Sequence, residues 1–299
     1  MQAVHQIVLA CLLGLTLAIA GADASQPAPA MDGNSLVRVS AVAEYQAAQV
    51  RKAVPIAVRF QIEDGWHTYW KNPGDSGAEM LIKYDGPEWA SIGELHWPVP
   101  KRYLSPGDLL DFVHEGTVVL LTELTVDPVK WEAAGRPASL EFDLDCEWFV
   151  CKDICLLGEG SVSLKIPVTT ETASKNSSAV TAFAQARRAL PRTREDGADQ
   201  MYKGSFKDGV LTLSVGWATH MTFFPAPSKA LALPVDALKE AEAESGTLRI
   251  RYRDEAGSVE HLEGVLVFER GQRGAANHTV TAIEVRVPVN AGQPTPSTD

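Results

Sequence analysis

Short runs in which apolar and polar residues alternate, separated by turn residues, dominate the chain from Leu36 onward. A period of two places successive side chains on opposite faces of a β-strand. Many such runs punctuated by Gly, Pro, Asp and Asn are typical of a β-sandwich. We therefore predict an all-β chain whose first domain is a sandwich over residues 35–169. Its clearest strands are expected at residues 54–62, 118–126, 140–146 and 162–168.

A second, smaller β-rich domain is predicted over residues 201–289. Its clearest strands are expected at residues 210–215, 247–252, 264–268 and 283–287, with a short helix at 235–244. Residues 169–178 are rich in Thr and Ser, which is typical of a linker, and a linker with a helix is predicted over residues 170–200. Within it, a short helix from about Ala179 to Leu190 is predicted, capped by Ser178 and ended by Pro191.

The amino-terminal segment has the pattern of a signal peptide. Residues 7–20 form an apolar run that is too short to span a membrane, and Ala22-Asp23-Ala24 fits a small-x-small cleavage site. We therefore expect residues 1–24 to be a signal peptide cleaved near Ala24, and the mature protein to be periplasmic. The segment before the run lacks Lys and Arg, which leaves a buried amino-terminal helix as the alternative.

Composition and charge argue against nucleic acid as a partner and against a membrane span in the mature chain. The chain has 299 residues, 45% of them hydrophobic, and a formal net charge of −11. The absence of a basic patch makes nucleic acid a poor partner. No later apolar run reaches about 18 residues, so we expect no membrane span in the mature chain. Residues 25–34 are expected to be a flexible leader and residues 290–299 a disordered tail.

Three of the four cysteines lie within ten residues: Cys146, Cys151 and Cys155. Cys11 would leave with the signal peptide, so three cysteines remain in the mature chain and at least one of them is unpaired within it. Cys151 and Cys155 would lie ~13 Å apart along one strand, whereas a disulfide needs Cα atoms within roughly 7 Å. A bond between them therefore requires a turn at residues 152–154, most simply the tip of a hairpin.

Spacing alone leaves the role of this pair open. A disulfide that closes so short a loop stabilises a protein by about 2 kcal/mol, and a sandwich of this size should not depend on it. The bond could be an inert crosslink or a reactive pair. Three thiolates with gaps of four and three residues match no common zinc or iron–sulfur spacing. Cu(I) binding stays as an alternative, and Cys146 is an extra thiol with no assigned role.

Three stretches carry a resemblance to a known family. They are residues 62–77 (IEDGWHTYWKNPGDSG), residues 97–100 leading to 111–116 (WPVP and DFVHEG), and residues 151–159. Together they resemble the periplasmic amino-terminal domain of the thiol:disulfide interchange protein DsbD. The similarity is greater to the ScsB-like branch, which is tied to copper-sensitivity suppression.

The resemblance implies an immunoglobulin-like sandwich with a redox-active pair formed by Cys151 and Cys155. In the family, a membrane electron-donor hub reduces the pair, which then reduces thioredoxin-fold periplasmic partners. By position, Cys155 forms the mixed disulfide and Cys151 resolves it. This favours a protein-disulfide reductase without a cofactor or metal, linked to copper tolerance or to cytochrome or disulfide maturation. The alternative is a non-catalytic module that binds a partner protein or Cu(I) and carries a structural disulfide.

The family also shields its pair with an aromatic cap, for which Phe112 is the matching residue, with Asp111 beside it. Tyr69 matches a tyrosine near the sulfurs. His67 and His114 are candidates for tuning a thiol near neutral pH. Core packing is the alternative for Phe112 and Tyr69, and a surface position for the histidines.

The chain departs from the family pattern in two places. The cap region reads Asp-Phe-Val-His rather than aromatic-Gly-aromatic. The membrane hub and the terminal thioredoxin domain of full-length members have no counterpart here. We therefore expect the electron donor to be a separate protein.

Overall fold

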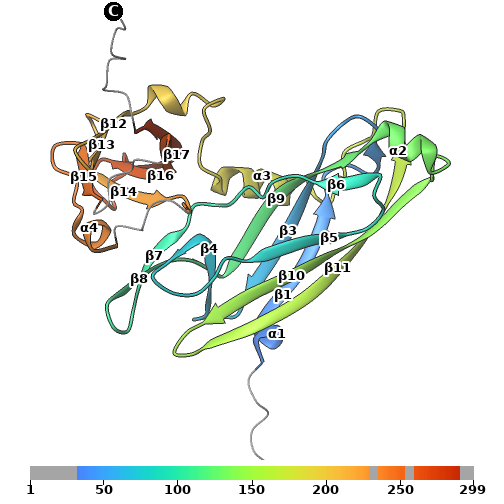
Figure 1. Ribbon diagram of the computed structural model, residues 1–299, viewed down its shortest axis with the longest axis horizontal. Coiled ribbons are helices and arrows are strands. Elements are labelled where there is room, and N and C mark those ends of the chain that lie inside the picture. The colour runs from blue at the N-terminus through green and yellow to red at the C-terminus, as the bar shows by residue number, and fades with distance from the viewer. Residues whose placement is uncertain (1–31, 229–234, 253–258, 290–299) are drawn as a thin grey trace, which may run out of the picture. The chain divides into compact units, whose positions relative to one another are not determined.

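The computed structural model describes residues 32–228, 235–252 and 259–289, and these belong to one compact unit that starts at Asp32. The predicted signal peptide and tail lie outside the described residues. Among the described residues, no helix is long and apolar enough to cross a membrane. Most described residues belong to strands, which confirms the prediction of an all-β chain (Figure 1).

The amino-terminal region is a sandwich of two antiparallel-dominated sheets (Figure 1). The first sheet has the order β1-β3-β9-β6, and the second has the order β2-β11-β10-β4-β8-β7, with β5 also paired to β10. In the first sheet the strands are β1 (Val37–Ala43), β3 (Val54–Ile62), β6 (Ala90–Ile92) and β9 (Thr117–Val126). In the second they are β2 (Ala48–Gln49), β4 (His67–Gly74), β5 (Leu81–Asp85), β7 (Lys101–Ser105), β8 (Leu109–Glu115), β10 (Ser139–Cys151) and β11 (Cys155–Thr169).

Alternation along these strands builds the core. Ile56, Val58 and Phe60 recur at every second position of β3 and are fully buried. Phe60 meets Trp148 of the opposite sheet edge to face, with ring centroids 6.0 Å apart. Burial of large aromatic and aliphatic side chains is the main stabilising contribution to such a sandwich.

The carboxy-terminal region contains two three-stranded sheets, β12-β13-β15 and β14-β16-β17. Their strands are β12 (Lys203–Lys207), β13 (Val210–Ser214), β14 (His220–Pro225), β15 (Thr247–Arg251), β16 (His261–Arg270) and β17 (Thr279–Pro288). One cluster of buried apolar side chains runs through both β regions. The domain boundaries at residues 169 and 201 stay predictions, because the described residues belong to one compact unit.

Four α-helices and one 3-10 helix complete the described fold: α1 (Gly33–Leu36), α2 (Pro128–Ala133), α3 (Val180–Ala189), α4 (Val235–Glu240) and η1 (Ala198–Gln200). The helix predicted near residue 235 is therefore present but shorter. The helix α3 packs Phe183 and Ala186 against Ala57 and Leu121 of the first sheet.

Three local expectations are corrected. The Ser178 hydroxyl donates to Asn176 Oδ1 and does not cap α3, because the cap position is Ala179. The end of the predicted leader is ordered, since Asn34 Oδ1 accepts a hydrogen bond from the Glu159 backbone. The strands predicted at 140–146 and 162–168 extend to the hairpin tip, because polar and glycine positions there still satisfy the ladder between β10 and β11.

Candidate functional site

A disulfide joins Cys151 and Cys155 at the tip of the β10–β11 hairpin. The two residues are direct cross-strand partners with Cα atoms 4.2 Å apart. Residues 152–154 form the turn, in which the Lys152 N–H donates to the Ile154 carbonyl at 3.1 Å. The structure therefore has the turn that a bond between residues four apart requires.

The two cysteines differ sharply in exposure. Cys151 is 2% exposed, whereas Cys155 belongs to the exposed class. Cys151 is covered by Tyr69, Val113 and the partly buried Tyr103. Because attack on a disulfide requires access to a sulfur, Cys155 is the cysteine that a macromolecule can approach first.

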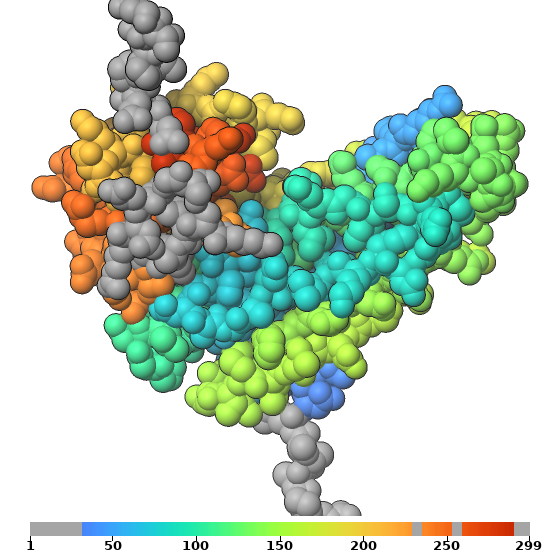
Figure 2. All heavy atoms as spheres, in the orientation of Figure 1, coloured from blue at the N-terminus to red at the C-terminus, as the bar shows by residue number. Residues whose placement is uncertain are grey.

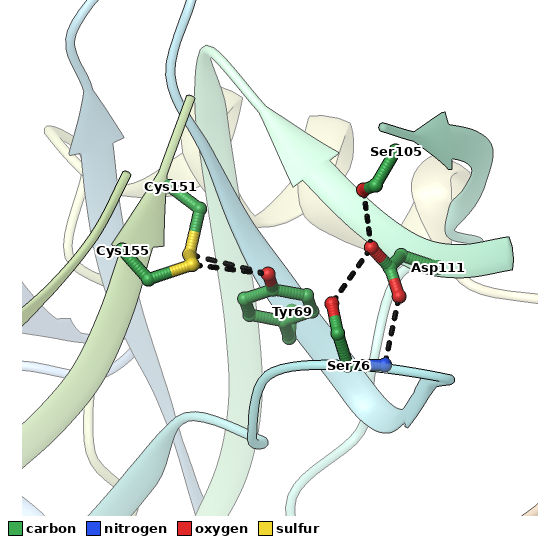
Figure 3. The surroundings of a disulfide bond; sticks show 6 residues. All are labelled: Tyr69, Ser76, Ser105, Asp111, Cys151 and Cys155. Carbon is green, nitrogen blue, oxygen red and sulfur yellow. Dashed lines mark hydrogen bonds between the residues drawn. A yellow bond between two sulfur atoms is a disulfide. The ribbon is translucent and has the colours of Figure 1, made fainter. Parts of the chain in front are cut away.

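The Tyr69 hydroxyl lies against both sulfurs (Figure 3). It is 3.1 Å from Cys151 Sγ and 3.6 Å from Cys155 Sγ. Burial raises the pKa of Tyr69, with the Asp111 charge acting in the same direction and a Ser76 hydrogen bond opposing it. The phenol therefore stays protonated near neutral pH and can donate a hydrogen bond to sulfur.

The glycine at position 77 makes room for this tyrosine. Gly77 has a φ of +76°, and a Cβ there would overlap the Tyr69 ring. An alanine would therefore be strained in its backbone and would displace the ring. The conspicuous run from Gly65 to Gly77 thus has a physical role at the disulfide.

Asp111 is a fully buried carboxylate on the same side of the sheet. It accepts hydrogen bonds from the Ser76 backbone and hydroxyl, both at 2.9 Å, and from the Ser105 hydroxyl at 2.5 Å (Figure 3). Three donors satisfy the carboxylate without a cation. They join β7 and β8 to the loop that follows β4, beside Tyr69.

Strand alternation separates the remaining predicted residues into two groups. On β8, Val113 faces the disulfide, while Phe112 and His114 point to the opposite face. Phe112 is fully buried and packs against Trp70 and Phe224, with centroids 6.3 and 5.3 Å away. The structure therefore places Phe112 in the main core rather than with the sulfurs.

The two histidines are both buried, in different surroundings. His67 is the cross-strand partner of Cys151 and lies 4.5 Å from Tyr103 between ring centroids. Burial lowers the pKa of His67 against the opposing charges of Asp111 and Glu115. His114 stacks on Trp97, away from the disulfide, and burial lowers its pKa to about 3. Both rings are neutral near neutral pH, so neither supplies a positive charge to a thiolate.

Comparison with known proteins shows what this site is similar to. Residues 34–167 match the family model described as "Thiol:disulfide interchange protein DsbD, N-terminal". The resemblance carried by the three sequence stretches is thereby confirmed, and the family together with the disulfide indicates thiol–disulfide redox chemistry.

One solved structure shows a similar fold beyond the matched segment. The crystal structure of the N-terminal periplasmic domain of ScsB from Proteus mirabilis has a TM-score of 0.57 at 18% identity, and the match covers 86% of this chain and 96% of that one. The reduced DsbD N-terminal domain of Neisseria meningitidis covers 46% of this chain and 88% of its own, with a TM-score of 0.26 at 12% identity. No curated protein matches the chain.

Cys146 lies apart from the disulfide-bonded pair. It is 1% exposed, and its thiol contacts the Leu144 carbonyl at 3.6 Å. Burial and the neighbouring Asp145 charge raise the pKa of the Cys146 thiol to about 12. A thiol of this kind is unreactive at neutral pH. Among the described residues no group of three or more His, Cys, Asp and Glu side chains could hold a metal ion.

Four residues of the site were not predicted from the sequence: Tyr103 and Val113, which cover Cys151, and Ser76 and Ser105, which donate to Asp111. One signal was available: Pro106-Gly107-Asp108 is a turn sequence flanked by residues that form β7 and β8. A hairpin there predicts that residues 103, 105, 111 and 113 share one face.

Proposed function

We propose that this chain is an exported protein-disulfide reductase that passes two electrons from reduced Cys151 and Cys155 to thioredoxin-fold partners. The observation that carries the proposal is the unequal burial of the two cysteines at an exposed hairpin tip. A crosslink with only a structural role has no need of one accessible sulfur and one sulfur held under a tyrosine hydroxyl.

The exchange proceeds in two steps. In the reduced protein, the Cys155 thiolate attacks one sulfur of the partner's disulfide. A mixed disulfide forms, and the second partner sulfur leaves as a thiolate. The Cys151 thiolate then attacks Cys155 Sγ, which restores the Cys151–Cys155 bond and releases the partner as a dithiol. The pair is oxidised by two electrons, the partner is reduced by two, and solvent supplies the protons.

Tyr69 supports the second step. Its hydroxyl contacts Cys151 Sγ at 3.1 Å in the disulfide form. In the reduced form the same hydroxyl can donate to the Cys151 thiolate, and a hydrogen bond to a charged acceptor is stronger than one to a neutral acceptor. No positive charge from His67 assists, because burial lowers the pKa of that imidazole.

Apolar side chains around the hairpin suit a protein partner. Ile154 is 56% and Leu157 62% exposed beside Cys155. Leu104 and Leu109, on the neighbouring β7–β8 hairpin, are 62% and 39% exposed. Figure 2 shows both hairpin tips on the visible surface. Exposed apolar groups gathered at a reactive sulfur favour a macromolecular substrate over a small thiol.

The partners and the compartment are part of the proposal. A thioredoxin-fold protein supplies the disulfide to be reduced, and a separate membrane-embedded dithiol protein supplies the electrons. The chain acts in the periplasm after removal of residues 1–24. The similarity in fold to a periplasmic domain of Proteus mirabilis ScsB supports this placement.

Single-cysteine variants test the exchange. Reduced Cys151→Ala should accumulate a mixed disulfide with oxidised thioredoxin, visible as a covalent adduct on a non-reducing gel after acid quenching. Reduced Cys155→Ala should form no adduct and should leave thioredoxin oxidised. Cys146→Ala is the matched control, and its exchange rate should equal that of the wild-type chain.

Two results would contradict the proposal. One is thioredoxin reduction at the wild-type rate by both Cys151→Ala and Cys155→Ala. The other is a reduction potential of the pair well below about −300 mV, since that value is typical of structural disulfides. The second result would favour a binding module with a structural crosslink.

A further inference from the structure

The β7–β8 hairpin is placed between the disulfide and the carboxy-terminal β region. On one face it contributes Tyr103 and Val113 to the cover over Cys151. On its other face, Phe112 packs against Phe224 of β14 with ring centroids 5.3 Å apart and planes at 76°. A displacement of this hairpin would therefore change the packing of Tyr103 and Val113 over Cys151.

The helix α4 contacts the same hairpin at two places, on strand β7 and at its turn. On β7, the Arg102 guanidinium donates to the Leu238 carbonyl at 2.7 Å. That carbonyl belongs to the last turn of α4, where backbone acceptors lack partners within the helix. At the hairpin turn, Lys239 Nζ donates to the Asp108 carbonyl and pairs with its carboxylate at 3.2 Å.

The hairpin turn itself is conformationally demanding. Gly107 and Asp108 both have left-handed backbones, with φ of +91° and +63°. The Lys239 ammonium contacts both the carbonyl and the carboxylate of Asp108, although the Asp108 side chain is 80% exposed. These contacts restrain the turn.

The segment joining the two β regions is itself fixed at both ends. Arg187 of α3 forms a bidentate ion pair with buried Glu44, at 2.8 and 2.6 Å. Further on, the Arg192 backbone donates to Ala282 and accepts from Glu284 of β17. The contacts of α4 are therefore made by a region that is held to the sandwich rather than tethered loosely.

We infer that the carboxy-terminal β region is a positioning element for the redox pair, acting through Arg102, Lys239 and Phe224. It holds the β7–β8 hairpin over Cys151 and leaves Cys155 accessible to a partner protein. The resolving sulfur is thus kept from other reactants until the mixed disulfide has formed. The inference rests on the proposed function only for the role of Cys151 as the resolving thiol.

Thiol reactivity tests this inference without a partner protein. Cys151 is followed in the Cys155→Ala chain, and Cys155 in the Cys151→Ala chain. In each, iodoacetamide alkylation is quantified by peptide mass spectrometry at one pH. Adding Lys239→Ala should speed alkylation of Cys151 about five-fold, a change typical of losing one or two partly exposed polar contacts. Alkylation of Cys155 should change less than about two-fold.

Three further variants sharpen the test. Arg102→Ala should act in the same direction as Lys239→Ala, because it releases strand β7 of the same hairpin from α4. Lys239→Arg should restore the slow rate. Lys165→Ala is the matched control, since it removes an exposed ion pair with Glu141 at a distance from the hairpin. Unchanged melting temperatures would separate a local effect from loss of folding.

Equal alkylation of Cys151 in the wild-type, Lys239→Ala and Arg102→Ala backgrounds would overturn the inference. So would a parallel rise at Cys151 and Cys155, because that result indicates general loosening. Neither outcome bears on the mixed-disulfide experiment, so failure of the positioning role and failure of the exchange function are distinguishable.

Discussion

The two faces of strand β10 carry cysteines with opposite chemical surroundings. Cys146 and Cys151 are almost equally buried, at 1% and 2% exposure. Five positions separate them, so alternation sends their side chains to opposite faces. Cys146 lies in the core beside the Leu144 carbonyl, and Cys151 lies on the outer face beside the Tyr69 hydroxyl.

Burial alone therefore does not decide the reactivity of a cysteine in this strand. In the core, burial and the Asp145 charge raise the pKa of Cys146 to about 12. On the outer face, Cys151 has a hydroxyl donor, a disulfide partner and the end of a hairpin. Strand β4 shows the same contrast. Its adjacent residues Tyr69 and Trp70 point to opposite faces, and Tyr69 contacts the disulfide whereas Trp70 packs in the core.

The largest expected effect is on the core face of β4. Trp70→Ala should lower the free energy of unfolding by about 3–5 kcal/mol, because it empties a fully buried aromatic site between Phe112 and Phe224. Tyr69→Phe, at the next position, should cost about 1 kcal/mol or less. Urea unfolding followed by circular dichroism measures both. Equal losses would contradict the division between the two faces.

The next effect concerns pH and the core-facing His114. Its pKa is about 3 in the folded protein and about 6.5 when unfolded. The unfolded state therefore takes up the proton first as pH falls. Stability present above pH 6.5 is lost progressively towards pH 3, with a loss of about 2 kcal/mol by pH 5.

His114→Gln should remove this part of the pH dependence. The difference in unfolding free energy between pH 7.5 and pH 5 should shrink by about 2 kcal/mol relative to the wild-type chain. His96→Gln, at an exposed position, should leave it unchanged. A difference as large in His114→Gln as in the wild-type chain would assign this part of the pH dependence to other groups, such as the buried His67.

A smaller effect is expected at the hydroxyl that faces the sulfurs. In a Cys155→Ala background, Tyr69→Phe should raise the pKa of the Cys151 thiol, because the thiolate loses a hydrogen-bond donor. The ¹³Cβ chemical shift of labelled cysteine reports the titration. Tyr84→Phe is the matched control, since its hydroxyl contacts the Pro87 carbonyl instead. An unchanged Cys151 titration would show that the Tyr69 hydroxyl does not stabilise the Cys151 thiolate.

The smallest effect is expected for Cys146→Ala. Loss of one buried sulfur should cost about 1 kcal/mol of stability, comparable to deleting one methyl-sized group. Exchange with thioredoxin should proceed at the wild-type rate. A slower rate in a fully folded Cys146→Ala chain would show that both faces of β10 contribute to the redox chemistry.

Much of the site followed from local sequence. The spacing of Cys151 and Cys155 required a turn, and the structure has it at residues 152–154. The resemblance of residues 62–77 singled out Tyr69, which lies against the sulfurs. The prediction that Phe112 caps the disulfide was wrong, because the face of the sheet to which a strand residue points depends on the register of the strand. The register of β8 is fixed by pairs such as Tyr69 with Val113, which are far apart in sequence.

The sequence by itself determined the all-β architecture, the hairpin at the cysteine pair and the family of the first region. Each depends on short-range periodicity, turn chemistry or a contiguous motif. Only the tertiary structure decided which cysteine is open, which face of β8 meets the sulfurs, and that α4 holds the β7–β8 hairpin. These depend on contacts between segments more than 40 residues apart, such as Tyr69 with Val113, Tyr69 with Cys151 and Arg102 with Leu238. The period of a strand predicts two faces, but only packing against other elements assigns one to the core and the other to chemistry.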